Sequence, residues 1–109
     1  MTDRDPEQKH LPLTESTTYI LLALIEPLHG YGVMQKVREM SDGLVEIGAG
    51  TLYGALSTLQ KEGLIHKVHE ENRRKSYTLT PRGKRVLQGQ IRRLEIMTRE
   101  GVKAIDGSD

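Results

Sequence analysis

The sequence predicts a mostly α-helical chain with a small β-hairpin, arranged as a winged helix-turn-helix with an added C-terminal dimerisation helix. Three short segments carry apolar residues at helical spacing, a fourth has the two-residue period of strands, and a long helical segment follows. At 109 residues without cysteine, the chain has the length of one domain, and disulfides and thiolate metal sites are excluded.

The expected organisation has four parts. We predict a flexible N-terminal tail over residues 1–10, a winged helix-turn-helix over 11–80, a dimerisation helix over 81–105 and a short tail over 106–109. The first ten residues mix both charges and lack the apolar core of a signal peptide. The longest apolar run of the chain is too short to span a membrane. We therefore expect a cytoplasmic protein without a membrane partner.

The first two helices are predicted over residues 15–26 and 31–41. Thr14 is the expected N-cap of the first helix, whose apolar residues cover nearly all sides. That pattern is typical of burial on more than one face, and Leu22 belongs to the surplus apolar side. The second helix keeps a single apolar face with the 3.6-residue period.

The third helix, predicted over residues 51–62, has one apolar stripe and one face of short or polar side chains. In a helix-turn-helix, the second helix of the motif lies in the major groove and presents its N-terminal residues to bases and phosphates. No acidic residue lies on this face before Glu62. We expect DNA contacts from Gly50, Thr51, Tyr53, Gly54, Ser57 and Lys61. The alternative is the solvent side of an ordinary amphipathic helix.

A β-hairpin with a charged tip is predicted after the third helix. Its arms are rich in β-branched and aromatic residues, and its tip contains Arg73, Arg74 and Lys75 in a row. Such a wing can place cations against phosphates or in a minor groove. Glu70 and Glu71 either pair with the arginines and orient them or reduce their attraction for a polyanion. The alternative for the whole tip is a solvated loop.

The last helix, introduced by Thr80 and Pro81, carries an apolar seam at coiled-coil spacing. A complete three-helix core leaves little in the same chain to cover this seam or the surplus apolar side of the first helix. A second copy of the chain covers both by two-fold symmetry. We therefore expect a homodimer with the interface residues Leu22, Leu87, Ile91, Leu94, Thr98 and Ile105. The alternative is that the helix folds back on its own domain.

The net charge of +1 conceals an uneven distribution of charge. Residues 1–59 hold four Lys or Arg against eight Asp or Glu, whereas residues 60–99 hold eleven against four. A positive C-terminal half favours a polyanionic partner such as double-stranded DNA, and an ordinary solvated face is the alternative.

No sequence pattern supports catalysis or metal binding. The chain has no nucleophile elbow, and its glycine-rich segment near residue 50 lacks the lysine and the spacing of a phosphate-binding loop. His66 and His69 lie three apart on a predicted strand, so alternation sends them to opposite faces. His29, just before Gly30, is interpreted as a local structural contact. We expect no enzyme activity, no cofactor and no metal.

Several short motifs occur in an order and at distances that are specific in combination. They are Leu21-Leu22-Ala23-Leu24, His29-Gly30-Tyr31-Gly32, Gly50-Thr51-Leu52-Tyr53, Glu62-Gly63-Leu64-Ile65 and Tyr77-Thr78-Leu79-Thr80. From about residue 11 to residue 87, the chain resembles the PadR family of bacterial transcriptional regulators, in its compact form with a single C-terminal helix.

The resemblance implies a winged-helix homodimer that binds a palindromic operator and usually represses transcription. It also implies that Gly50, Thr51, Leu52 and Tyr53 open the recognition helix. Tyr53 is then expected to contact DNA, and Tyr31 to contact a phosphate at the start of the second helix. Some compact relatives bind flat aromatic compounds between aromatic side chains at the dimer interface. This chain has no Trp or Phe, and its four tyrosines all precede the last helix. A small-molecule effector of another, unknown kind stays open.

These patterns together predict a sequence-specific, DNA-binding transcriptional regulator. We expect it to act as a homodimeric repressor that binds a palindromic operator. The alternative is a winged-helix protein–protein interaction module that does not bind DNA. The basic hairpin tip and the acid-free face of the third helix favour the first hypothesis, and a gel shift combined with a partner pull-down discriminates between the two.

Overall fold

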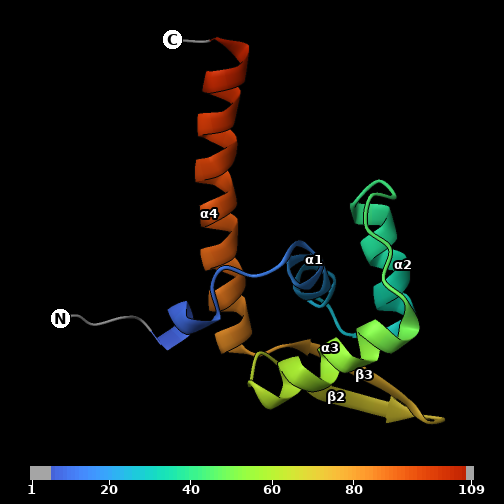
Figure 1. The fold of residues 1–109 in the computed structure, drawn as a ribbon. Helices are drawn as coiled ribbons and strands as arrows, with labels where there is room; N and C mark the ends of the chain where they lie inside the picture. Colours follow the sequence, from blue (N-terminus) through green and yellow to red (C-terminus); the bar gives the residue numbers. More distant parts are fainter. Residues whose placement is uncertain (1–5, 108–109) are drawn as a thin grey trace.

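The computed structural model describes residues 6–107, which form short helices, a three-stranded sheet and a long C-terminal helix (Figure 1). This architecture confirms the predicted order of three helices, hairpin and final helix. The elements are the 3-10 helix η1 (Pro6–His10), α1 (Glu15–Ala23), β1 (Leu28–His29), α2 (Gly30–Met40), α3 (Ala49–Lys61), β2 (Ile65–Glu71), β3 (Arg74–Leu79) and α4 (Pro81–Asp106). Residues 1–5 and 108–109, in the two predicted tails, lie outside the described residues.

The sheet contains a short strand, β1, that the sequence analysis does not predict. In β1, Leu28 pairs with Tyr77 and His29 with Ser76 of β3, and β3 also pairs with β2, which gives the antiparallel order β1-β3-β2. Two residues are too few to show the alternation that identifies a strand. Because β1 leads directly into α2, this pairing fixes the start of α2 beside the hairpin.

The core lies where α1, α2 and α3 meet the base of the hairpin and the first turns of α4. Its fully buried side chains include Leu21, Val33, Leu52, Leu64 and Val86, one from each of these parts. Burial of one such side chain is worth about 1.5–3 kcal/mol. The apolar faces of the three predicted helices therefore converge on one another, as their periodicity indicates.

α1 ends three residues earlier than predicted, because its last carbonyl groups bond to β3. The Leu24 carbonyl accepts hydrogen bonds from the Leu79 amide at 3.1 Å and from the Thr78 hydroxyl at 2.7 Å. These two bonds join the end of α1 to the hairpin. They involve residues more than fifty positions apart, so the local pattern around Ala23 does not reveal them.

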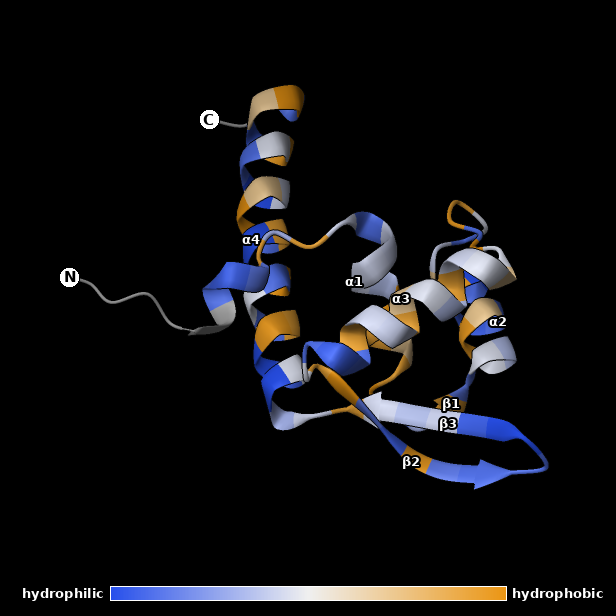
Figure 2. Cartoon of the chain, turned by 60° about the horizontal axis from the view of Figure 1, so that its bottom comes forward, coloured by the Kyte–Doolittle hydropathy of each residue, from blue (hydrophilic) through white to orange (hydrophobic). Residues whose placement is uncertain are grey.

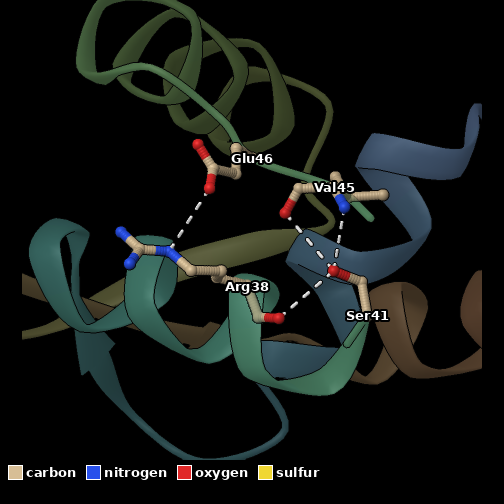
Figure 3. A network of polar contacts seen from close by, with 4 residues as sticks. All are labelled: Arg38, Ser41, Val45 and Glu46. Carbon is tan, nitrogen blue, oxygen red and sulfur yellow. Dashed lines mark hydrogen bonds and ion pairs between the residues drawn. The ribbon is translucent and has the colours of Figure 1, made fainter. Parts of the chain in front are cut away.

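The connection between α2 and α3 is attached to the end of α2 by Ser41 (Figure 3). The buried Ser41 hydroxyl accepts from the Val45 amide at 3.0 Å and lies 3.3 Å from the carbonyl oxygens of Arg38 and Val45. An exposed ion pair joins Arg38 Nε to Glu46 Oε2 at 3.8 Å. Since Val45 and Ile47 are buried in the core, this connection holds α2 and α3 together although it is longer than a tight turn.

The start of α4 is attached to the turn after α3 through Thr80. The Thr80 hydroxyl donates to the Gly63 carbonyl at 2.6 Å and accepts from the Gly83 amide at 3.0 Å, and the Thr80 amide donates to the Leu64 carbonyl at 3.1 Å. A Cβ at Gly83 would lie 2.9 Å from the Leu64 carbonyl carbon, so the two backbones are in close contact. We call these four residues the α3–α4 junction. Thr80 is the N-cap of α4, as predicted.

Residues 6–10 differ from the expected flexible tail, since they form η1 and pack on α4. The next residues are held by the buried side chain of Gln90, whose Oε1 accepts from the Leu13 amide at 3.0 Å and whose Nε2 donates to the Leu13 carbonyl at 3.1 Å. Leu11 packs on Gly89, where a Cβ would lie 2.9 Å from Leu11 Cδ1. The attachment depends on a residue far along the chain, which explains why the polar N-terminal sequence shows no sign of it.

Beyond Gln90, α4 leaves the core and extends away from the other elements (Figure 1). Apolar residues recur along this part of the helix (Figure 2), and Met97 and Ile105 are 62% and 86% exposed. Leu87 differs from the other expected seam residues, because it is only 5% exposed and packs in the core of its own chain. The free apolar surface of α4 therefore begins at Ile91, one turn later than expected.

We predict that Gly83→Ala destabilises the fold by about 1–3 kcal/mol, because the added methyl group overlaps main-chain atoms that cannot easily move. Gly54→Ala is the matched control, because Gly54 also lies inside a helix but away from the α4 seam. The space around Gly54 is open, so alanine there stabilises the helix by up to about 1 kcal/mol. Urea unfolding at one protein concentration measures both variants. Equal unfolding midpoints for Gly83→Ala and the wild type would contradict the close contact at the junction.

Candidate nucleic-acid interface

An open cleft of about 530 Å³ lies between the start of α2, the outer face of α3 and the hairpin. Six of the predicted DNA contacts line it: Tyr31, Tyr53, Ser57, Arg73, Arg74 and Lys75. The other lining residues are His29, Gly30, Leu56, Gln60 and Tyr77. Among the described residues, the lining therefore carries three cationic side chains and no carboxylate. We call this hollow the α3–wing cleft.

Tyr53 of α3 packs across the start of α2. A Cβ at Gly30 would lie 2.6 Å from Tyr53 Cζ, so a side chain at this position would displace the ring. Tyr53 and Tyr31 are nevertheless 55% and 59% exposed. The Tyr53 ring thus lies against the start of α2, while both tyrosines keep much of their surface available to a ligand.

The remaining predicted residues of α3 lie outside this cleft. Gly50, Thr51 and Lys61 are exposed, and the space around Gly50 and Gly54 is open. Gly54 lines a different hollow, which α3 forms with the start of α1 and which also includes Thr58. The polar face of α3 is therefore divided between a side toward the wing and a side toward η1.

The wing ends in a two-residue turn with an unusual backbone conformation. Its central residues, Asn72 and Arg73, both have positive φ angles, 53° and 69°. This is the type I′ geometry that matches the twist of a hairpin, and glycine is the usual second residue. A left-handed conformation costs a non-glycine residue about 1–2 kcal/mol. An arginine at this position, held in place despite that cost, favours a role for its side chain.

The acidic residues of the hairpin pair with other groups, and not with the arginines of the tip. Lys67 Nζ donates to Glu70 Oε1 at 2.9 Å, and this hydrogen bond raises the pKa of Lys67 and lowers the pKa of Glu70. Glu71 Oε1 lies 3.2 Å from His69 Nε2. Within residues 6–107, no carboxylate lies within ion-pair distance of the three tip cations. The expected pairing of these acids with the arginines is therefore not found.

His66 and His69 share one face of the sheet, which corrects the expectation from simple alternation. They pair with Thr78 and Ser76, which lie two apart on β3, because the register of β2 is irregular between Lys67 and His69. No sequence pattern marks this bulge. The described residues contain no group of three possible metal ligands. None of the helices in residues 6–107 is both long and apolar enough to cross a membrane.

His29 is a residue of the cleft that the sequence analysis assigns only to a local contact. That contact is present, because His29 Nδ1 accepts from the Gly32 amide at 3.3 Å and caps α2. Its position beside the wing depends on the pairing of β1 with Ser76. In the sequence, the one sign that His29 belongs to the cleft is its position directly before Gly30, the first residue of α2.

Three short helices, a hairpin beside the third helix and a cationic cleft between them define a winged helix-turn-helix protein. The model of the transcriptional regulator PadR-like family matches residues 20–89, more than half of the chain. The chain therefore belongs to the PadR-like family, whose members are transcriptional regulators and not enzymes. Over 70 residues, 63% of the chain, it is 36% identical to an uncharacterized 37.1 kDa protein in transposon TN4556 of Streptomyces fradiae. It spans 20% of the length of that relative.

Two solved structures are similar over most of the chain. A transcriptional regulator from Clostridium thermocellum is 26% identical with a TM-score of 0.71, and the match covers 96% of this chain and 99% of that one. A PadR family transcription regulator from Clostridium difficile is 27% identical with a TM-score of 0.65, covering 84% of this chain and 96% of that one. These similarities confirm the winged-helix fold with its C-terminal helix.

Two substitutions at Arg73 separate its charge from its backbone conformation. We predict that Arg73→Gly stabilises the protein by about 1 kcal/mol, because glycine adopts the left-handed conformation without strain. Arg73→Ala keeps the Cβ and its strain, so its stability stays near that of the wild type. Urea unfolding of both variants measures the difference, and an Arg73→Gly variant less stable than Arg73→Ala would contradict the strained turn.

Proposed function

We propose that the chain is a sequence-specific DNA-binding repressor that acts as a homodimer on a palindromic operator. The observation that carries this proposal is the α3–wing cleft, with three cations, two exposed tyrosines and no carboxylate among its described lining residues. Such a lining favours the phosphates of a nucleic acid. Membership of a family of transcriptional regulators supports duplex DNA as the partner.

In this proposal, α3 lies in the major groove and the wing lies against the sugar–phosphate backbone. Gly50 and Gly54 have open space around them, so the duplex can approach the backbone of α3 closely. Thr51 and Ser57 are exposed and offer hydroxyl groups to base edges or phosphates. Contacts from α3 then determine the preferred sequence, while the cations of the wing contribute affinity for any duplex.

The homodimer forms, in this proposal, through α4 and the side of α1 that faces it. A largely apolar groove of about 440 Å³ runs between these helices, with a lining that includes Leu22, Ile91, Leu94 and Met97. Thr98 and Ile105 continue the exposed seam along α4. A second copy related by a two-fold axis covers both surfaces and presents two α3 helices to half-sites about 34–36 Å apart, or a multiple of that distance.

Duplex binding is expected to weaken steeply as salt concentration rises, because cations that bind phosphates release counterions. Simultaneous replacement of Arg73, Arg74 and Lys75 by alanine should lower the affinity for all duplexes. It should also reduce the slope of log K against log salt by up to about 0.9 for each cation that contacts a phosphate. Fluorescence anisotropy of a labelled duplex over a range of salt concentrations measures both quantities.

Arg99→Ala is a matched control for this experiment. Arg99 is an exposed cation on α4 that pairs with Glu100 at 3.5 Å, so its loss should leave the salt slope unchanged. Tyr53→Ala should weaken binding without removing a charge. If both Tyr53→Ala and the triple variant keep the wild-type affinity for DNA, the cleft is not part of the DNA interface. A wild-type protein that binds no duplex at low salt would favour a protein–protein interaction module.

Leu94→Asp is expected to convert the dimer to a monomer, because it places a carboxylate in the apolar seam of α4. Ile96→Asp is the matched control, since Leu94 and Ile96 are 37% and 38% exposed but lie on opposite sides of the helix. Sedimentation velocity at micromolar concentration measures the mass of each variant, and circular dichroism checks that the helices are intact. A Leu94→Asp protein that remains dimeric would place the interface elsewhere.

A further inference from the structure

We infer that His29 donates a hydrogen bond from Nε2 to an oxygen of the DNA backbone, and that it does so as an uncharged imidazole. The inference rests on the proposed function, because it adds one contact to the same interface. It gives a binding role to a residue that the sequence pattern marks only as a structural contact.

The hydrogen bond at the start of α2 determines which ring nitrogen of His29 carries the proton. Nδ1 accepts from the Gly32 amide at 3.3 Å. A nitrogen that accepts an N–H bond has no hydrogen of its own, so the neutral ring carries its proton on Nε2. Nε2 is therefore a hydrogen-bond donor.

The ring of His29 is held in position before any ligand binds. His29 pairs with Ser76 of β3 and adopts an extended conformation, φ −87° and ψ 167°, directly before α2. A Cβ at Gly32 would lie 3.8 Å from His29 Cε1, which places the ring against the first turn of α2. A donor that is already ordered loses little conformational entropy when it binds.

His29 lies between the α3–wing cleft and a second hollow on the hairpin. The second hollow, of about 590 Å³, is lined by His29, His69, Glu71, Asn72, Arg74 and Ser76. Of the described residues, only His29 and Arg74 line both hollows. A DNA strand that passes Arg74 between these two hollows therefore also passes His29. Glu71 is the carboxylate in the second hollow, and its Oε1 lies 3.2 Å from His69 Nε2.

Nε2 of His29 is free to bind a ligand. Within residues 6–107, the hydrogen bond to Gly32 is the one polar contact of the His29 side chain. In this part of the chain, His10 Nε2 is the one buried side-chain nitrogen or oxygen atom that lacks a hydrogen-bond partner. His29 Nε2 is therefore accessible to solvent, and a backbone oxygen of DNA can take the place of water there.

A neutral donor and a cation have different salt signatures. A cation that binds a phosphate releases a counterion and steepens the salt dependence, whereas a neutral donor adds affinity and leaves the slope unchanged. We predict that His29→Asn binds duplex about tenfold more weakly at every salt concentration with the wild-type slope. Asparagine is a good N-cap and preserves the start of α2, but its amide is too short to replace Nε2.

His66→Asn is the matched control, because His66 is exposed on β2 and lines neither hollow. Its affinity and slope should equal those of the wild type. Equal affinity of His29→Asn and wild type overturns the contact and leaves the proposed function intact. A reduced slope in His29→Asn overturns the uncharged donor. A wild-type protein that binds no duplex overturns the proposed function and the contact together.

A second measurement needs no variant and so does not depend on how His29→Asn folds. Nitrogen-15 NMR of the histidine rings in the wild-type protein should show the His29 proton on Nε2 and a shift of that resonance when duplex is added. A proton on Nδ1, or an Nε2 resonance that saturating duplex does not move, overturns the inference.

Discussion

The close contact between Gly83 and the Leu64 carbonyl, strengthened by the hydrogen bonds of Thr80, is the constraint on which the arrangement of the molecule depends. α3 ends just before this junction, β2 begins just after Leu64, and α4 begins just after Thr80. One compact site therefore fixes the directions of the helix proposed to read DNA, of the wing and of the helix proposed to form the dimer. In a dimer joined through α4, this fixed direction sets the distance between the two copies of α3.

The cationic character of the cleft comes from local pairing and does not require a large net charge. The chain as a whole carries only +1. Glu70 is paired with Lys67 on the same strand, and Glu71 lines the neighbouring hollow and not the cleft. The turn that presents Arg73 is strained, and the ring of Tyr53 occupies the space beside Gly30 that a side chain there would take. The strained turn therefore lowers the stability of the hairpin tip, where the cations are exposed.

The features that the sequence predicts correctly are those that local residue patterns determine. Helical spacing locates α1, α2, α3 and α4, Thr80 marks the cap of α4, and the row of cations marks the hairpin tip. Prediction from the sequence fails where a contact joins distant segments. The strand β1, the bulge that brings His66 and His69 to one face, and the attachment of Leu13 to Gln90 have no periodic signature. Six predicted site residues line one cleft, but the position of His29 beside them becomes visible only from the pairing of β1 with β3.

The central claim is that two copies of the chain place their α3 helices in two successive major grooves on one face of a duplex. Hydroxyl-radical footprinting on duplexes selected from a random library tests it most directly. The proposed dimer predicts two protected segments related by a dyad, with centres separated by about 10–10.5 base pairs or a multiple of that spacing. A single protected segment without a dyad, or no protection at low salt, would contradict the account.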